Sequence, residues 1–101
     1  MAVIIIENKR SHKGEGYYVG RPSVLGNPYP MKDEKDRTEV IARYRVWLWA
    51  ELKKNGVVAD ELHKLAAEYK DKGKLVLICW CHPKPCHAEI IAAAVKWLAS
   101  K

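Results

Sequence analysis

The sequence lacks any apolar run long enough to cross a membrane or to form the core of a signal peptide. Its N-terminal run, residues 2–6, is followed directly by Glu7, whereas a membrane-spanning helix needs about 20 apolar residues. We therefore expect a cytoplasmic protein with no membrane partner. Internal repeats and low-complexity linkers are also missing, so the 101 residues are expected to form one α/β domain, residues 1–101.

The common glycine-rich phosphate-binding signatures are absent as well. No stretch reads G-x-G-x-x-G or G-x-x-x-x-G-K-[ST], so dinucleotide oxidoreductases and P-loop nucleoside triphosphatases lose their main support. Cysteine is scarce, with Cys79, Cys81 and Cys86 as the whole set. Three cysteines cannot all pair within one chain, and a reducing compartment keeps them as thiols, which leaves metal binding, catalysis or packing as their roles.

Positive charge is in excess, with 18 Lys and Arg against 12 Asp and Glu and a formal net charge of +6. A basic surface suits an anionic partner, either a phosphate-bearing small molecule or nucleotide, or a nucleic acid. A high content of Lys and Glu is also typical of thermostable proteins, in which such charges are only solvated. Both interpretations stay open at this point.

Strand-like and helix-like segments alternate along the chain. The first strand, residues 2–6, is apolar throughout and is expected to be covered on both of its faces. Asp36 and Glu39 have capping-box spacing at the start of the first helix. Strands are expected at residues 2–6, 17–19 and 74–80, and helices from Asp33 or Asp36 to Asn55, from Val58 to Gly73, and from about Pro85 onward.

This order, β-β-α-α-β-α, predicts a small α/β sandwich of two or three layers with about three mostly parallel strands and three main helices. The direction of the second strand is not fixed by the pattern. Val46 and Trp49 fall off the apolar face of the first helix. They are compatible with a homodimer surface or with a second layer of core packing.

The segment 20–32 holds three prolines and two glycines in thirteen positions. Proline fixes φ and glycine permits unusual φ, so this loop has a preset shape. Such a loop can aim Arg21 and Asn27 at a ligand. Alternatively, it is a structural crossover packed by Leu25 and Tyr29.

The segment Cys79–His87 places all three cysteines and two of the four histidines within nine residues. In a strand followed by a helix, Cys86 and His87 fall in the first turn of the last helix, where unpaired amides and the helix dipole hold an anion or lower a thiol's pKa. Cys86 is then a reactive thiolate, with His87 or His82 exchanging protons with it or with substrate.

Two other interpretations of this segment remain. Zinc could be held by Cys79, Cys81, Cys86 and His87, although the spacing lacks the two-residue knuckle of common zinc fingers. Alternatively, the cysteines are small buried apolar residues that let strand and helix pack closely. No cofactor is predicted beyond this zinc alternative.

The segments Tyr18–Pro28 and Cys79–His87 together resemble domain-of-unknown-function family 4326, which occurs in bacteria and phages. The resemblance implies a compact Rossmann-like domain whose two signature segments meet, with nucleotide or nucleic-acid metabolism as the expected setting. It rests on these shared positions: Gly20, Arg21, Pro22, Ser23, Leu25, Gly26, Asn27, Pro28, Cys79, Trp80, Cys81, Pro83, Cys86 and His87.

These observations lead to one functional hypothesis, a hydrolase or transferase that acts on a nucleotide or nucleobase in a pocket between the two segments. Cys86 and His87 are its candidate catalytic residues. The candidate ligand-binding residues are Gly20, Arg21, Ser23, Gly26, Asn27, Trp80 and Cys81. The alternatives are a zinc-stabilised structural domain and a non-catalytic nucleic-acid-binding or adaptor module that uses Lys9, Arg10 and Lys13. The sequence does not decide whether the protein is an enzyme.

Overall fold

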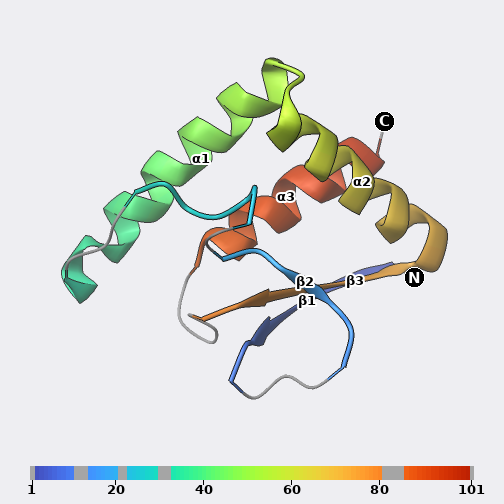
Figure 1. The fold of residues 1–101 in the computed structure, drawn as a ribbon, viewed down its shortest axis with the longest axis horizontal. Coiled ribbons are helices and arrows are strands. Elements are labelled where there is room, and N and C mark those ends of the chain that lie inside the picture. The colour runs from blue at the N-terminus through green and yellow to red at the C-terminus, as the bar shows by residue number, and fades with distance from the viewer. Residues whose placement is uncertain (1, 11–13, 21–22, 30–32, 81–85, 101) are drawn as a thin grey trace.

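The protein is described by a computed structural model that covers residues 2–10, 14–20, 23–29, 33–80 and 86–100. Three strands, three α-helices and one 3-10 turn follow in the predicted β-β-α-α-β-α order (Figure 1). They are β1 (Val3–Asn8), β2 (Tyr17–Tyr18), η1 (Glu34–Asp36), α1 (Arg37–Lys53), α2 (Val57–Lys72), β3 (Lys74–Cys79) and α3 (His87–Ala99).

The three strands form one parallel sheet in the order β1-β3-β2. β3 is central, as the sequence predicts, and the short β2 pairs with it through Tyr17 and Tyr18, so the direction that the pattern left open is parallel. Because all strands run the same way, Asn8, Tyr18 and Cys79 end at one edge of the sheet. This edge is named the carboxyl edge below.

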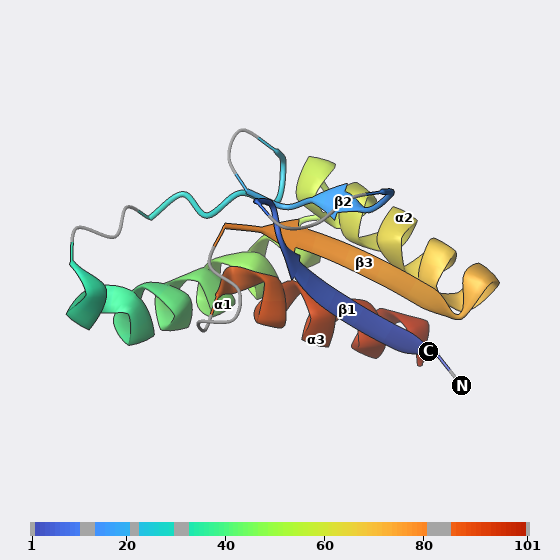
Figure 2. The same ribbon diagram turned by 90° about the horizontal axis from the view of Figure 1, so that it is seen from below.

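All three helices lie on the same side of the sheet, so the sandwich has two layers (Figures 1 and 2). Leu75, Leu77 and Cys79 of β3 alternate toward the helices and are almost fully buried. The opposite face, seen from its own side in Figure 2, carries no helix of the described residues and is named the open face. A Cβ built on Gly16 would lie only 2.8 Å from Cδ1 of Ile78, so the chain before β2 packs over part of this face.

The expectation that the first strand is covered on both faces is wrong. No residue of β1 is fully buried, and Val3 is 45% exposed. On the side of β1 that faces the helices, Ile4 and Ile6 pack against the core. Its other side belongs to the open face, because there is no helix on that side to cover it.

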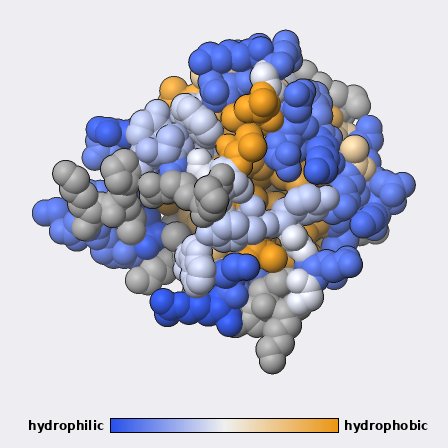
Figure 3. Space-filling model, in the orientation of Figure 1, coloured by the Kyte–Doolittle hydropathy of each residue, from blue (hydrophilic) through white to orange (hydrophobic). Residues whose placement is uncertain are grey.

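The predicted apolar faces of the helices are largely confirmed. α1 buries Tyr44, Leu48 and Leu52, while α2 buries Val58, Leu62, Leu65 and Ala66 and ends at the left-handed Gly73. Trp49 packs edge-on against Trp97 of α3, with ring centroids 5.2 Å apart, whereas Val46 is 72% exposed. A homodimer through Val46 therefore stays a prediction. Figure 3 shows one face of the molecule, on which apolar side chains gather in the middle and hydrophilic side chains surround them.

The predicted capping box at Asp36 and Glu39 is wrong. Asp36 makes no side-chain cap bond because the chain enters α1 through η1, which gives Asp36 helical dihedral angles (φ −84°, ψ −7°). A capping side chain reaches back only from an extended backbone. The extended cap residue is Asp33, which caps η1.

The two ends of the described chain both lie on the side of the molecule opposite the carboxyl edge, and Figure 1 shows them apart from each other (Figures 1 and 2). Among the described residues, no helix combines the length and the apolar character needed to span a bilayer.

Candidate functional site

Hydrogen bonds join the chain after β2 to the chain after β3 at the carboxyl edge. Nε2 of His87 lies 2.7 Å from the carbonyl oxygen of Val19, and Nε1 of Trp80 donates to the hydroxyl of Tyr18 at 2.8 Å. The backbone amide of Val19 donates to the carbonyl of Ile78. These side-chain contacts join residues 62 and 68 positions apart, so the two signature segments meet as expected, at the edge where open parallel sheets bind ligands.

The thiol of Cys86 lies against the imidazole of His87, with Sγ 3.4 Å from Nδ1. A carbonyl oxygen only accepts hydrogen bonds, so Nε2 of His87 must carry the proton that points at Val19. In the neutral ring Nδ1 then has a lone pair and accepts the S–H of Cys86. If the proton moves to Nδ1, the result is a thiolate beside an imidazolium, and the same two contacts hold both forms.

Cys86 is also the N-cap of α3. Its sulfur accepts from the amide of Ala88 at 3.5 Å, and the carboxylate of Glu89 accepts from the amide of Cys86 at 3.0 Å, which completes a capping box. Two amides at the N-terminus of α3, which the sequence pattern indicates as phosphate donors, therefore already have acceptors. A phosphate at this edge consequently depends on cationic side chains more than on α3 amides.

The pair is shielded from solvent. Cys86 is 3% exposed and His87 is 9% exposed, while Cys79 on β3 is fully buried. The sulfur of Cys86 lies beneath the carboxyl edge with little contact with solvent. The two interpretations of Cys86, a small buried residue and a reactive thiol, are compatible, because its sulfur is buried and also contacts an imidazole.

Tyr44 of α1 supports the pair from the core side, a role that its place in an apolar helix face did not reveal. Its ring meets the ring of His87 edge-on at 5.1 Å, and its hydroxyl donates to the carbonyl of Leu25 at 2.7 Å. Burial, reinforced by the charge of Cys86, raises the pKa of Tyr44 far above its ordinary value. The hydroxyl therefore stays protonated and keeps the loop attached to α1.

The described part of the Gly20–Pro28 loop is built from consecutive tight turns. The amide of Ser23 donates to Gly20, the amide of Gly26 donates to Ser23, and Oδ1 of Asn27 accepts from the amide of Tyr29 at 2.9 Å. Asn27 therefore shapes the loop with its amide oxygen. The preset loop shape expected from proline and glycine is consistent with these bonds.

A small cavity of about 110 Å³ lies between this loop, β2 and α2. Ser23 contributes to its wall, and the buried Oγ of Ser23 has no hydrogen-bond partner among the described residues. Glu61 of α2 lines the same space. This volume is below the roughly 300 Å³ of a typical small-molecule pocket, so it holds at most a few waters or one small group.

Trp80 lies at the same edge but on the open face, on the other side of the sheet from Cys86 and His87. The alternation predicted for the strand is confirmed for Cys79, which is buried, and Trp80, which is 51% exposed, whereas Cys81 lies outside the described residues. Gly20 is part of this arrangement, because a Cβ on it would lie 2.5 Å from the hydroxyl oxygen of Tyr18. Only glycine leaves the Tyr18 hydroxyl in reach of Trp80.

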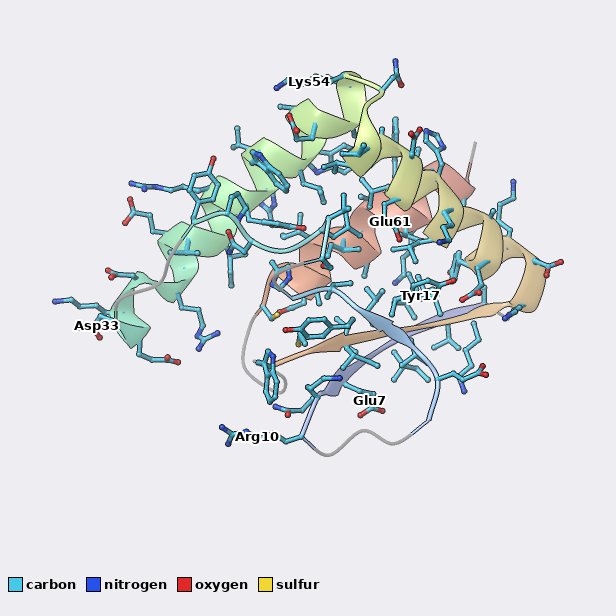
Figure 4. All side chains as sticks on the ribbon, viewed as in Figure 1. Glu7, Arg10, Tyr17, Asp33, Lys54 and Glu61 are labelled. Atoms are coloured by element: carbon cyan, nitrogen blue, oxygen red, sulfur yellow. The ribbon has the colours of Figure 1, made fainter. Side chains whose placement is uncertain are left out.

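Two cations flank these aromatic rings. Nζ of Lys9 lies 5.3 Å from the ring centroid of Tyr18, and Cζ of Arg10 lies 5.9 Å from that of Trp80. Figure 4 shows Arg10 and Glu7 on the side of the sheet away from the helices. Tyr18, Trp80, Lys9 and Arg10 are together named the edge platform.

The profile of one protein family, described as "Domain of unknown function (DUF4326)", matches residues 6–97. The chain belongs to this family. The resemblance read from the two motifs is thereby confirmed, and both motifs of the DUF4326 domain lie inside the matched range. No curated protein and no solved structure matches the chain.

Several predicted site residues of the DUF4326 domain, namely Arg21, Cys81 and His82, lie outside the described residues. Among the residues that the structure describes, no group of three or more His, Cys, Asp or Glu side chains is placed to hold a metal ion. The zinc set Cys79, Cys81, Cys86 and His87 includes Cys81 and stays a prediction.

Proposed function

We propose that the DUF4326 domain binds a phosphate-bearing, nucleotide-like ligand at the carboxyl edge and acts on it as a hydrolase or transferase. In this proposal Cys86 is the nucleophile and His87 is its proton acceptor. The observation that carries the proposal is the continuous contact from Sγ of Cys86 through the imidazole of His87 to the carbonyl of Val19.

This contact supports nucleophilic chemistry for a physical reason. A thiol becomes a strong nucleophile when a base accepts its proton, and that base works best when a third group fixes its orientation. Val19 fixes His87, and Tyr44 packs against the ring so that it cannot turn away. The amide of Ala88 and the positive end of the α3 dipole favour the thiolate that results.

The loop after β2 is proposed to form the other wall of the site. Val19 is its entry point, and Tyr44 ties its Leu25 carbonyl to α1, so the loop and His87 share the same support. Arg21, predicted from the sequence, is the proposed phosphate ligand. A cation is needed in this role because Glu89 and Cys86 already accept from amides at the start of α3.

The test is alkylation of the cysteines by iodoacetamide, read residue by residue by mass spectrometry. Cys86 should react faster than Cys79, because Sγ of Cys86 lies beside the imidazole of His87, and saturating nucleoside mono- or triphosphate should slow its reaction. Cys79 is the matched control, since both cysteines are buried. Equal rates for the two cysteines, or no protection of Cys86 by any nucleotide, would contradict the proposal.

Turnover is tested separately on the same nucleotides by measuring release of phosphate or free base. Cys86→Ser should abolish turnover and leave nucleotide affinity within a few-fold, because serine keeps the cap but is a far weaker nucleophile. His87→Gln should lower turnover for want of a base. A Cys86→Ser protein with unchanged turnover would remove Cys86 from the chemistry.

A further inference from the structure

We infer that the edge platform is a binding site for single-stranded nucleic acid, in which bases stack on Trp80 and Tyr18 while Lys9 and Arg10 contact phosphates. The inference goes beyond the proposed function and does not depend on it, because the platform and the Cys86–His87 pair face opposite sides of the sheet. It names a second site, with its own ligand class.

The first argument is that the exposed indole is held in place. Nε1 of Trp80 donates to Tyr18, and the backbone carbonyl of Trp80 accepts from Nδ2 of Asn8 at 3.2 Å. Asn8 in turn accepts from the amide of Arg10 through Oδ1 at 2.8 Å. A half-exposed tryptophan whose indole N–H and backbone carbonyl are both engaged loses little conformational entropy when a planar group stacks on it.

The second argument is that the rings already take planar or cationic partners. The guanidinium of Arg10 lies over Trp80, and the ammonium of Lys9 lies over Tyr18. Among the described residues, neither cation forms an ion pair with a carboxylate. Aromatic faces interleaved with cations that have no carboxylate partner match a polymer in which planar bases alternate with phosphates.

The third argument is that the platform continues onto the open face. The register places Ile78 beside Tyr18, and the same side of the sheet carries Ile5 and Val76. Ile78 is buried, and the chain before β2 packs over Ile78 and Val76, so the part of this face that is left beside the rings lies along β1, at Ile5. Glu7 is the carboxylate on this face, and it should weaken the binding of any phosphate that approaches it.

The experiment measures anisotropy of a fluorescein-labelled 12-nucleotide single strand, as RNA and as DNA, with the full chain. Binding should be present for single strands, and unlabelled duplex of the same sequence should compete at least ten-fold less well. Trp80→Ala should weaken binding roughly ten-fold or more, because a stacked base is lost. If Trp80→Ala weakens the binding of RNA more than that of DNA, the ligand is assigned as RNA, and the reverse result assigns it as DNA.

Two matched controls isolate the platform. Trp97→Ala removes another exposed tryptophan, on α3, and should leave binding within two-fold. Lys9→Gln should lower the slope of log K against log salt by about one, whereas Lys53→Gln, on α1, should not. Glu7→Gln should tighten binding because it removes the opposing charge.

Three results would overturn the inference: no binding of either strand, equal affinity for duplex and single strand, or equal losses for Trp80→Ala and Trp97→Ala. None of them touches the proposed function, which is read from Cys86 reactivity and mononucleotide turnover. Conversely, the wild type could show no nucleotide turnover while the Cys86→Ser protein binds the single strand normally. That result would contradict the proposed function and support the edge platform as a nucleic-acid site.

Discussion

At the scale of single residues, Cys86 combines two tasks that usually fall to different side chains. It caps α3 through its sulfur, and it contacts the imidazole of the next residue. Cysteine is not among the favoured N-cap residues, so capping alone does not explain a thiol at this position, whereas its contact with the imidazole of His87 does. Substitution of Cys86 separates the two tasks, because serine keeps a capping oxygen without the thiol and alanine removes both.

Cys86→Ala should lower the free energy of unfolding by about 1 kcal/mol, the usual loss when a capping side chain is removed. Cys86→Ser should stay closer to the wild type because its hydroxyl caps as well. Urea unfolding followed by circular dichroism measures both. If serine destabilises as much as alanine, the sulfur is not acting as a replaceable cap.

Gly20→Ala should cost about 1–3 kcal/mol, because the new methyl group would sit 2.5 Å from the Tyr18 hydroxyl and must displace it. The displaced phenol should also release Trp80, which is visible as a shift of the indole N–H signal in an NMR spectrum. In a Tyr18→Ala background the same substitution should cost much less. An equal cost in both backgrounds would mean that the tyrosine is not the obstacle.

At the scale of elements, the ends of α2 depend on backbone geometry more than on contacts. Gly73 follows the helix with φ +68°, and its amide donates to the carbonyl of Tyr69. It then leads directly into β3, so the left-handed turn sets the direction of the central strand.

Gly73→Ala should lower the free energy of unfolding by about 1–2 kcal/mol, since an L-residue is strained at this φ. No atom of the described residues lies within 4 Å of a Cβ at this position, so the cost is conformational and not steric. Gly56 is the matched control, because it is equally uncrowded but has φ −94°. Equal losses at the two glycines would contradict the backbone explanation, and thermal unfolding distinguishes them.

The elements themselves were largely predictable from the sequence, since apolar spacing gave α2 and the run after Gly73 gave β3. Their surroundings were less so. An isoleucine run in β1 indicates a strand equally well whether one face or two are covered, and the helix count on each side is a tertiary property. The capping box at Cys86 and Glu89 is not predicted by the sequence pattern, because the motif is defined for serine and threonine.

The site was partly predictable for a similar reason. The family resemblance implied that the two signature segments meet, and the parallel direction of β2, which the sequence pattern left open, brings Val19 and His87 to one edge. The pairing of Tyr18 with Trp80 could not be, because it depends on the register of a two-residue strand. Tyr44 reads in the sequence as one more core residue, and only its hydroxyl contact with Leu25 distinguishes it.

At the scale of the whole molecule, stability should depend on pH through Tyr44. Its pKa is raised in the folded protein, so above the ordinary value of 10.0 the unfolded chain loses a proton that the folded one keeps. The folded state then binds more protons, and the free energy of unfolding falls as pH rises.

Tyr44→Phe should be less stable than the wild type at neutral pH, by about 1–3 kcal/mol, because the buried Leu25 carbonyl loses its donor. The gap should narrow between about pH 9 and about pH 11, since only the wild type carries this titration. Tyr17, whose pKa is raised by burial and by its bond to Glu68, is common to both proteins and cancels. A gap that stays constant over this range would exclude the Tyr44 contribution, and urea midpoints at each pH provide the measurement.

The placement of both chain ends far from the carboxyl edge has a practical consequence. A purification tag, a fluorophore or a surface anchor attached at either end would project away from the thiol and from the aromatic rings. Immobilised protein would therefore present its carboxyl edge outward, whichever end is tethered.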